Sequence, residues 1–87
     1  MLLTRKDQEG KVVAYVYYTT VDSTGRLDKD GEYAFVTDAW VHESVRHKDI
    51  IRDFAKEGLH QCPQLRWAYW QRSKYNERIK MFDIRRF

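Results

Sequence analysis

The sequence predicts an α/β (α+β) domain: an antiparallel β-meander, a central helix, a strand parallel to its neighbour and a short C-terminal helix. Two observations carry this prediction. Residues 11–20 and 33–42 are rich in β-branched, aromatic and small apolar residues, which is typical of strands. Between residues 50 and 59 the apolar side chains instead recur every three to four positions, which indicates a helix with one buried face.

The first half of the chain predicts the meander. Residues 2–6 suit a short edge strand, and Gly10 can take the positive φ of the turn after it. Residues 11–20, KVVAYVYYTT, form the strongest strand pattern and should pair with this edge as a hairpin. A polar connector, 21–31, then leads to an antiparallel third strand at 33–42. That strand is apolar on both sides, so it is expected to be covered on both faces.

The second half of the chain predicts the helix and a fourth strand. Ile50, Ile51, Phe54, Ala55 and Leu59 mark the buried helical face, and Pro63 prevents the helix from continuing. Residues 65–71, LRWAYWQ, read as a strand, and a strand–helix–strand order favours a parallel neighbour reached by a right-handed crossover.

The tail, residues 73–87, predicts a short helix. Ser73 would cap it, and its apolar positions would be Tyr75, Ile79, Met81 and Phe82. Ile84 and Phe87 would then pack back on the body of the domain.

Composition limits the class of protein. A chain of 87 residues is expected to be one domain. A lone cysteine, Cys62, excludes an internal disulfide, and His42, His47 and His60 lack the spacing of a metal-ligand pair, so no metal is expected. No long apolar segment and no signal peptide is recognised, which predicts a cytoplasmic protein without membrane contact.

The charge is uneven along the chain. Residues 63–87 hold seven of the 16 basic residues and only two of the 13 acids, which favours an interaction with a partner. Aromatic and basic residues alternate there, as in sites that stack single-stranded nucleic acid, although alternate aromatics of a strand can equally be core. The aromatics are Trp67, Tyr69, Trp70 and Tyr75; the basic residues are Arg66, Arg72, Lys74, Arg78 and Lys80. An acidic protein partner, or self-association through an exposed edge strand, is the other interpretation.

A turn between the third strand and the helix, residues 41–49, is a candidate anion site. A strand that leads directly into a helix aims unpaired N–H groups at whatever lies above the turn. Arg46, His47 and Lys48 add positive charge, and Asp49 subtracts from it. The alternative is that Ser44 or Asp49 caps the helix and the basic side chains are simply solvated.

This strand and turn resemble the cofactor-binding core of the GNAT (general N-acetyltransferase) superfamily. The family's turn has the pattern V-x-P-x-x-(R/Q)-x-x-G-x-(G/A), and Val41 and Arg46 are in register with it. The pattern's proline, first glycine and last small residue are Glu43, Asp49 and Ile51 here. The resemblance covers residues 11–87, and nothing in this sequence corresponds to the family's N-terminal strand and two helices. It extends to reduced, degenerate GNAT-like proteins of bacteriophages.

The resemblance implies acetyl-CoA as the cofactor, with its pantetheine arm at the strand's end and its diphosphate on the turn. The implied cofactor-binding residues are Trp40, Val41, Arg46, His47, Lys48, Asp49, Ile50 and Ile51. Asp38 would be the general base. The family's C-terminal tyrosine acid corresponds to Phe82, which has no hydroxyl, so Tyr75 is the substitute candidate, with Tyr69 as the alternative.

Two functional hypotheses are consistent with these residues. The first is a non-catalytic remnant of the fold that binds a protein partner or itself, because Asp49, Ile51 and Phe82 depart from the pattern and the acceptor-binding half is missing. The second is an active acetyl-CoA-dependent N-acetyltransferase that uses Asp38. Nucleic-acid binding through the basic, aromatic C-terminal third is a further alternative.

Overall fold

One mixed sheet and one helix make up the domain. The computed structural model describes residues 1–72 and 78–86, without the side chains of 71–80. The five strands follow one another across the sheet in the order β1-β2-β3-β4-β5. The elements are β1 Leu2–Lys6, β2 Val12–Val21, β3 Tyr33–Val41, α1 His47–Gln61, β4 Trp67–Arg72, β5 Arg78–Asp83 and the 3₁₀ turn η1 Ile84–Arg86.

The pairing of the strands confirms the predicted fold class. β1 pairs antiparallel with β2, and β2 with β3, which gives the expected meander. β4 then returns parallel to β3 after α1, as the strand–helix–strand order predicts. β5 completes the sheet antiparallel to β4.

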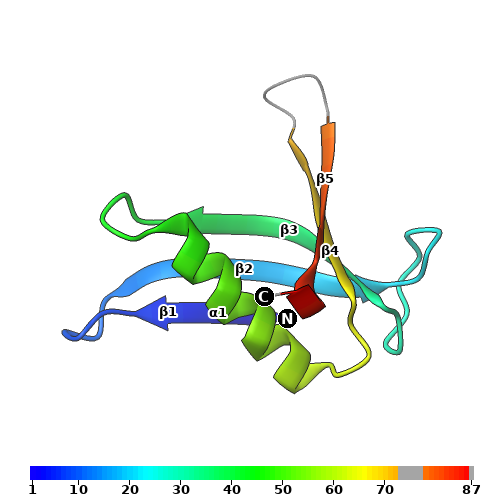
Figure 1. Cartoon of the computed structure of the whole chain (residues 1–87), viewed down its shortest axis with the longest axis horizontal. Coiled ribbons are helices and arrows are strands. Elements are labelled where there is room, and N and C mark those ends of the chain that lie inside the picture. Colours follow the sequence, from blue (N-terminus) through cyan, green and yellow to red (C-terminus); the bar gives the residue numbers. More distant parts are fainter. Residues whose placement is uncertain (73–77, 87) are drawn as a thin grey trace.

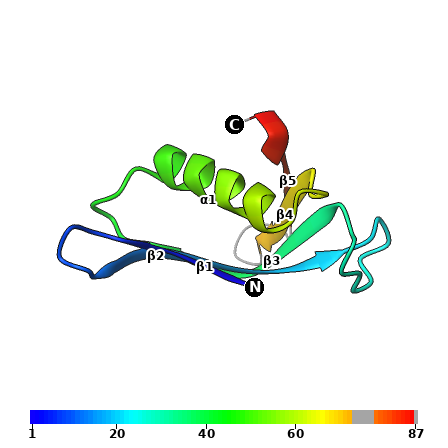
Figure 2. The ribbon, with the colours of Figure 1, turned by 90° about the horizontal axis from the view of Figure 1, so that it is seen from below.

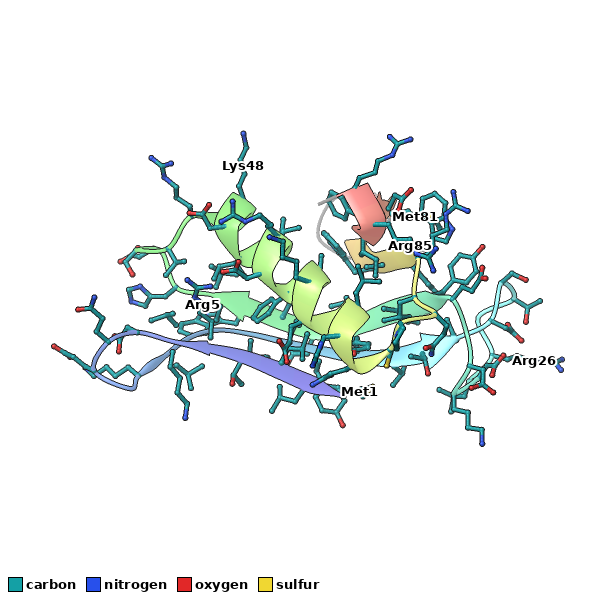
Figure 3. All side chains as sticks on the ribbon, turned by 60° about the horizontal axis from the view of Figure 1, so that its bottom comes forward. Met1, Arg5, Arg26, Lys48, Met81 and Arg85 are labelled. Atoms are coloured by element: carbon teal, nitrogen blue, oxygen red, sulfur yellow. The ribbon has the colours of Figure 1, made fainter. Side chains whose placement is uncertain are left out.

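The core lies between α1 and one face of the sheet (Figure 2). Its buried residues come from every part of the fold: Leu3, Tyr18, Ala34, Ala55, Cys62, Leu65 and Ile84. Arg5 on β1 forms an ion pair with Asp53 on α1, which ties the edge strand to the helix (Figure 3). No helix in the described part of the chain has the length and apolarity of a membrane span.

The prediction that the third strand is covered on both faces is wrong. α1 and η1 lie on the same face of the sheet, and no described element covers the other (Figure 2). Trp40 on β3 is 42% exposed, and Tyr17 on β2 is 47% exposed. The aromatic side chains on that face pack against one another instead: Phe35 and Tyr69 have ring centroids 5.0 Å apart.

The predicted helix in the tail is also wrong where the structure describes it. Residues 78–83 form β5, so Ile79, Met81 and Phe82 lie on a strand, and only Ile84–Arg86 are helical, as one 3₁₀ turn. Ladder hydrogen bonds to β4 outweigh the weak helical spacing of these residues. Ser73 and Tyr75 lie outside the described residues. Ile84 does pack back on the core, as expected.

β3 and β4 part soon after they meet. Only residues 33–35 pair with 67–69; beyond Phe35, β3 pairs with β2 alone and β4 with β5 alone. Figure 1 shows the β4–β5 hairpin running at a steep angle to β3. A β-bulge accompanies the separation: Tyr17 faces Asp38 whereas Tyr18 faces Val36, so Thr37 is the extra residue. Bulges bend the strand and increase its twist, which helps to turn β3 away from β4.

The connector between β2 and β3 depends on Gly31. A Cβ at this position would lie 2.1 Å from the Val21 carbonyl oxygen, so the backbone would have to move. At Gly10, by contrast, a Cβ meets nothing, and the only cost of a side chain there is the positive φ of 85°. Glycine is therefore required at position 31 because a side chain would clash, and it is favoured at position 10 because of the positive φ.

We expect Gly31→Ala to lower the free energy of unfolding by more than about 2 kcal/mol, because a backbone clash falls in the class of large single-site effects. Gly10→Ala should cost about 1 kcal/mol for the left-handed conformation. Urea unfolding monitored by tryptophan fluorescence measures both. A Gly31→Ala midpoint equal to or above that of Gly10→Ala would contradict the connector's geometry.

Candidate functional site

A cavity of about 460 Å³ lies between α1 and the sheet, beside the point where β3 and β4 part. Its inner end is lined by buried apolar residues, among them Leu3, Leu65 and Ile84. Its other end is lined by Asp38, Ala39 and His47, which are exposed, so the cavity opens to solvent there. A concave, mostly apolar space with a few polar groups at its mouth is the usual form of a small-molecule site.

One wall of this opening is the free edge of β3. Because β4 leaves β3 after Phe35, the backbone groups of residues 36–41 that face β4 have no strand among the described residues to pair with. The bulge residue Thr37 is fixed by its hydroxyl, which donates to the Tyr17 carbonyl oxygen at 3.2 Å. A free strand edge beside an apolar cavity can bind a ligand that carries both amide groups and an apolar arm.

The opposite wall is held by a stacked pair of rings. Trp70 on β4 and Phe82 on β5 both line the cavity, and their ring centroids are 5.0 Å apart. Two rigid aromatic side chains make this wall broad and apolar. Of the predicted nucleic-acid aromatics, Trp70 therefore belongs to the cavity, whereas Trp67 and Tyr69 alternate onto the uncovered face.

Asp38 belongs to the segment of β3 at the cavity mouth, and its carboxylate lies on the sheet face that carries Tyr15 and Trp40. The Tyr15 hydroxyl donates to Asp38 Oδ2 at 2.8 Å, across the β2–β3 pair. This hydrogen bond, together with partial burial and the negative charge of Asp38, raises the pKa of Tyr15 above its ordinary value. Tyr15 thus fixes the orientation of the carboxylate that the sequence singled out as a general base.

Trp40 does not line the cavity, unlike its neighbour Val41. Its ring lies on the other side of β3, 6.3 Å from the ring of Tyr15 and 6.0 Å from that of His42. His42 Nδ1 and the Ser44 hydroxyl are 2.7 Å apart. Ser44 therefore forms the turn before α1 and does not cap the helix.

The remaining predicted residues, at the start of α1, fall into two groups according to whether they line the cavity. His47, Ile50 and Ile51 line the cavity. Arg46, Lys48 and Asp49 do not; Lys48 points away from the sheet in Figure 3, and Asp49 Oδ1 lies 3.6 Å from Arg52 Nη2. Arg46 is the N-cap and makes no side-chain cap hydrogen bond, so the expectation that Ser44 or Asp49 caps the helix is wrong.

The start of α1 nevertheless keeps the features of an anion site. The first-turn N–H groups, those of His47, Lys48 and Asp49, have no acceptor one turn earlier in the helix, as at any helix N-terminus. The helix dipole and the basic side chains of 46–48 favour an anion here, and Asp49 opposes it. Ile51 faces the cavity and not the first-turn amides, so its bulk lies away from this site.

At the other end of the core, the Tyr18 hydroxyl contacts groups of the protein itself. The Tyr18 hydroxyl lies 3.3 Å from Gln61 Oε1, to which it donates, and 3.9 Å from Cys62 Sγ. Burial, and then the contact with Cys62, raises the pKa of Tyr18. In the described residues, no buried side-chain nitrogen or oxygen lacks a hydrogen-bond partner. A ligand at this end would therefore find no buried polar side chain in need of a hydrogen bond.

The structure therefore brings five of the predicted site residues to one cavity: Asp38, Val41, His47, Ile50 and Ile51. Tyr75, the predicted acid, lies outside the described residues. Tyr15 and Thr37 were not predicted as site residues, and Trp70 was predicted only for a nucleic-acid site. Antiparallel pairing of residues 11–20 with 33–42 would have brought Tyr15 near Asp38, but nothing in the sequence marks the bulge.

Asp38→Asn should lower the pKa of Tyr15 toward its ordinary value, because it removes the carboxylate that accepts the phenolic proton. Titration of the tyrosine rings by NMR measures this shift, with Tyr18 as the internal control because its raised pKa comes from burial and Cys62. The stabilisation from the Tyr15–Asp38 hydrogen bond is present at neutral pH and is lost as pH rises through the raised pKa of Tyr15. An unchanged Tyr15 titration in Asp38→Asn would contradict the hydrogen bond.

Comparison with known proteins relates this geometry to a fold. No protein-family model matches the chain, and no curated protein sequence matches it. The structure of the GNAT family N-acetyltransferase YhbS from Escherichia coli, solved in complex with CoA, matches with a TM-score of 0.60 at 16% identity. The match covers 95% of this chain and 58% of YhbS, so the chain spans little more than half the length of that protein.

A second solved structure, provisionally named a phosphinothricin N-acetyltransferase, matches with a TM-score of 0.51 at 20% identity. This match covers 86% of the chain and 46% of the other protein. At these identities the likeness concerns the fold. The domain has the fold of the GNAT N-acetyltransferases, in a chain about half as long as these two structures.

Proposed function

We propose that this domain binds a coenzyme A thioester in the cleft between β3 and β4. The observation that carries the proposal is the parting of these strands after Phe35, which leaves the edge of residues 36–41 free beside the apolar cavity. The amide groups of a pantetheine arm can pair with such an edge as an added strand would. That YhbS was solved in complex with CoA supports the same ligand class for this fold.

The start of α1 supports the position of the diphosphate. In this proposal, the amides of His47, Lys48 and Asp49 bind phosphate oxygens, and the basic side chains of 46–48 supply the counter-charge. The Asp49 carboxylate lies 3.6 Å from Arg52, which offsets part of its repulsion. The negative charge of Asp49 therefore weakens the site without blocking access to the amides.

Acyl transfer to an amine would add one requirement, a base near the thioester. Asp38 is the acid on the segment of β3 that lines the cavity mouth, and its carboxylate accepts from Tyr15 on the sheet face that carries Trp40. A water at the free edge of β3 would have to connect it to the thioester. In an active enzyme, Asp38 would accept the amine's proton through this water as the amine attacks the thioester carbonyl. Binding is the part of the proposal that the described residues support most directly.

Asp49→Asn should tighten binding of coenzyme A by about two- to fivefold, because it removes one exposed like charge near the diphosphate. Isothermal titration calorimetry at low salt gives the affinity, and the gain should shrink as ionic strength rises. Glu57→Gln is the matched control: it removes one acid from the same helix, beyond its first turn. Equal effects of the two variants, or no binding of coenzyme A to the unaltered protein, would contradict the proposal.

A second candidate function is a non-catalytic interaction protein, and the uncovered sheet face favours it. Leu2, Tyr17, Trp40 and Met81 are exposed by 55, 47, 42 and 51%, respectively, and strand alternation places all four on this face. Aromatic residues and methionine are enriched in the centres of protein interfaces. Several exposed apolar side chains on one face of a folded domain favour a binding partner.

We propose a second copy of the chain as that partner. The acids that strand alternation places on this face already have partners: Asp38 accepts from Tyr15, and Asp83 lies 3.7 Å from Arg86 Nε. Arg66, at the start of β4, lies with its guanidinium carbon 5.3 Å from the centre of the Trp67 ring. A two-fold related copy would therefore bring apolar rings together without setting like charges against each other at the centre.

Tyr17→Glu should convert a dimer to a monomer, because two buried carboxylates would face each other across the two-fold axis. Sedimentation velocity at several protein concentrations measures the state. Gln8→Glu, in the exposed β1–β2 turn, adds the same charge away from this face and should leave the dimer intact. A monomeric mass for the unaltered protein at the highest concentration would eliminate self-association.

A further inference from the structure

We propose that the cavity under α1 binds a medium-chain acyl group, so that the preferred ligand is a thioester of roughly eight to twelve carbons and not acetyl-CoA. This inference rests on the proposed binding of a coenzyme A thioester and specifies the acyl group that it carries. Its basis is the size, shape and chemistry of the cavity.

The cavity is much larger than an acetyl group requires. Its volume is about 460 Å³. An apolar cavity of roughly 150 Å³ is enough to bind benzene, a ligand of six carbons. Part of this space runs along residues 36–41, where the pantetheine arm would lie. A two-carbon acetyl group beyond that arm would leave the inner end empty, and the lining there would lose the contacts that stabilise a packed core.

The cavity is also long. The residues of α1 that line it run from His47 in the first turn to Gly58 in the last. At the rise of an α-helix, this stretch corresponds to roughly 16 Å. A space that follows a helix over this distance suits a linear chain better than a compact acyl group.

The lining becomes apolar with depth. Thr37 and His47 lie at the end beside the free edge of β3, where the thioester carbonyl would sit. Beyond them the walls are Val16, Val36 and Phe54, and the far end is closed by Leu3, Leu65 and Ile84. Tyr18, the polar group near the far end, already bonds within the protein. A hydrocarbon tail can be buried among these apolar side chains, whereas a polar tail would be buried without hydrogen-bond partners.

The lining residues also show where a substitution would shorten the acyl chain that the cavity can hold. Val16 on β2 lines the cavity, whereas Val13 on the same strand does not. Val16→Phe adds volume inside the cavity, and Val13→Phe adds the same volume outside it. Because Val16→Phe would fill empty space, the variant should fold; Val36→Leu is a second, smaller filling at another wall.

The test is calorimetry of the full chain with coenzyme A, acetyl-CoA, octanoyl-CoA and lauroyl-CoA, each below its micelle concentration. Burial of a methylene is worth about fourfold in affinity, so octanoyl-CoA should bind at least about 100-fold more tightly than acetyl-CoA. Val16→Phe should remove most of that difference without changing the affinity for coenzyme A, and Val36→Leu should reduce it partly. Val13→Phe should behave as the unaltered protein.

Failure of this inference can be told apart from failure of the proposed function. If coenzyme A and acetyl-CoA bind but octanoyl-CoA binds no more tightly than acetyl-CoA, the cavity does not take the acyl chain and this inference is wrong. If none of the four compounds binds, the proposed function itself is wrong, and the inference fails with it. Octanoyl-CoA affinity that is unaffected by Val16→Phe would show that the chain binds elsewhere, which also overturns the inference.

Discussion

The parting of β3 from β4 is the constraint on which the rest of the structure depends. Three parallel pairs, residues 33–35 with 67–69, hold the two halves of the sheet together. Beyond them, β3 pairs with β2 alone and β4 with β5 alone, and α1 lies over one face of the sheet (Figure 2). An unpaired edge is costly unless something covers or uses it. In the proposal made above, the ligand would pair with this edge.

Each wall of the cleft is held by contacts with the next strand of the sheet. On one side, the bulge at Thr37 and the Tyr15–Asp38 hydrogen bond fix β3 against β2. On the other side, the Trp70–Phe82 stack fixes β4 against β5. The helix above is tied to β1 by Arg5 and Asp53, and its end is followed by the buried Cys62 and Leu65. The cavity is part of the core itself, because most of the buried residues that form the core also line it.

Much of this fold could be predicted from the sequence, because its signals are local. The run of β-branched and aromatic residues in 11–20 and the spacing of Ile50, Phe54 and Leu59 identify β2 and α1 directly. The parallel return of β4 follows from a general rule of chain connection. The tail was harder to predict, since Ile79 and Met81 alternate as in a strand, whereas Tyr75, Ile79 and Phe82 also fit helical spacing.

The site could be predicted only in part, because it depends on what neighbouring strands do. Apolar residues on both sides of β3 suggest two covering layers, but the outer rings of Phe35 and Tyr69 cover each other. No residue type announces the bulge at Thr37, and the cavity arises from side chains of α1 and all five strands. Sequence patterns locate Asp38 and the turn before α1; only the packing shows that Ile51 faces the cavity and Lys48 faces solvent.

The most direct test of the cleft as a ligand site is amide hydrogen exchange of β3, measured by NMR with and without coenzyme A. In the free protein, the amides of residues 36–41 that face β4 should exchange rapidly, because no strand pairs with them. Coenzyme A should slow their exchange, while the amides that face β2 change little. If the β4-facing amides are already protected in the free protein, or if coenzyme A leaves them unprotected, the cleft is not the ligand site.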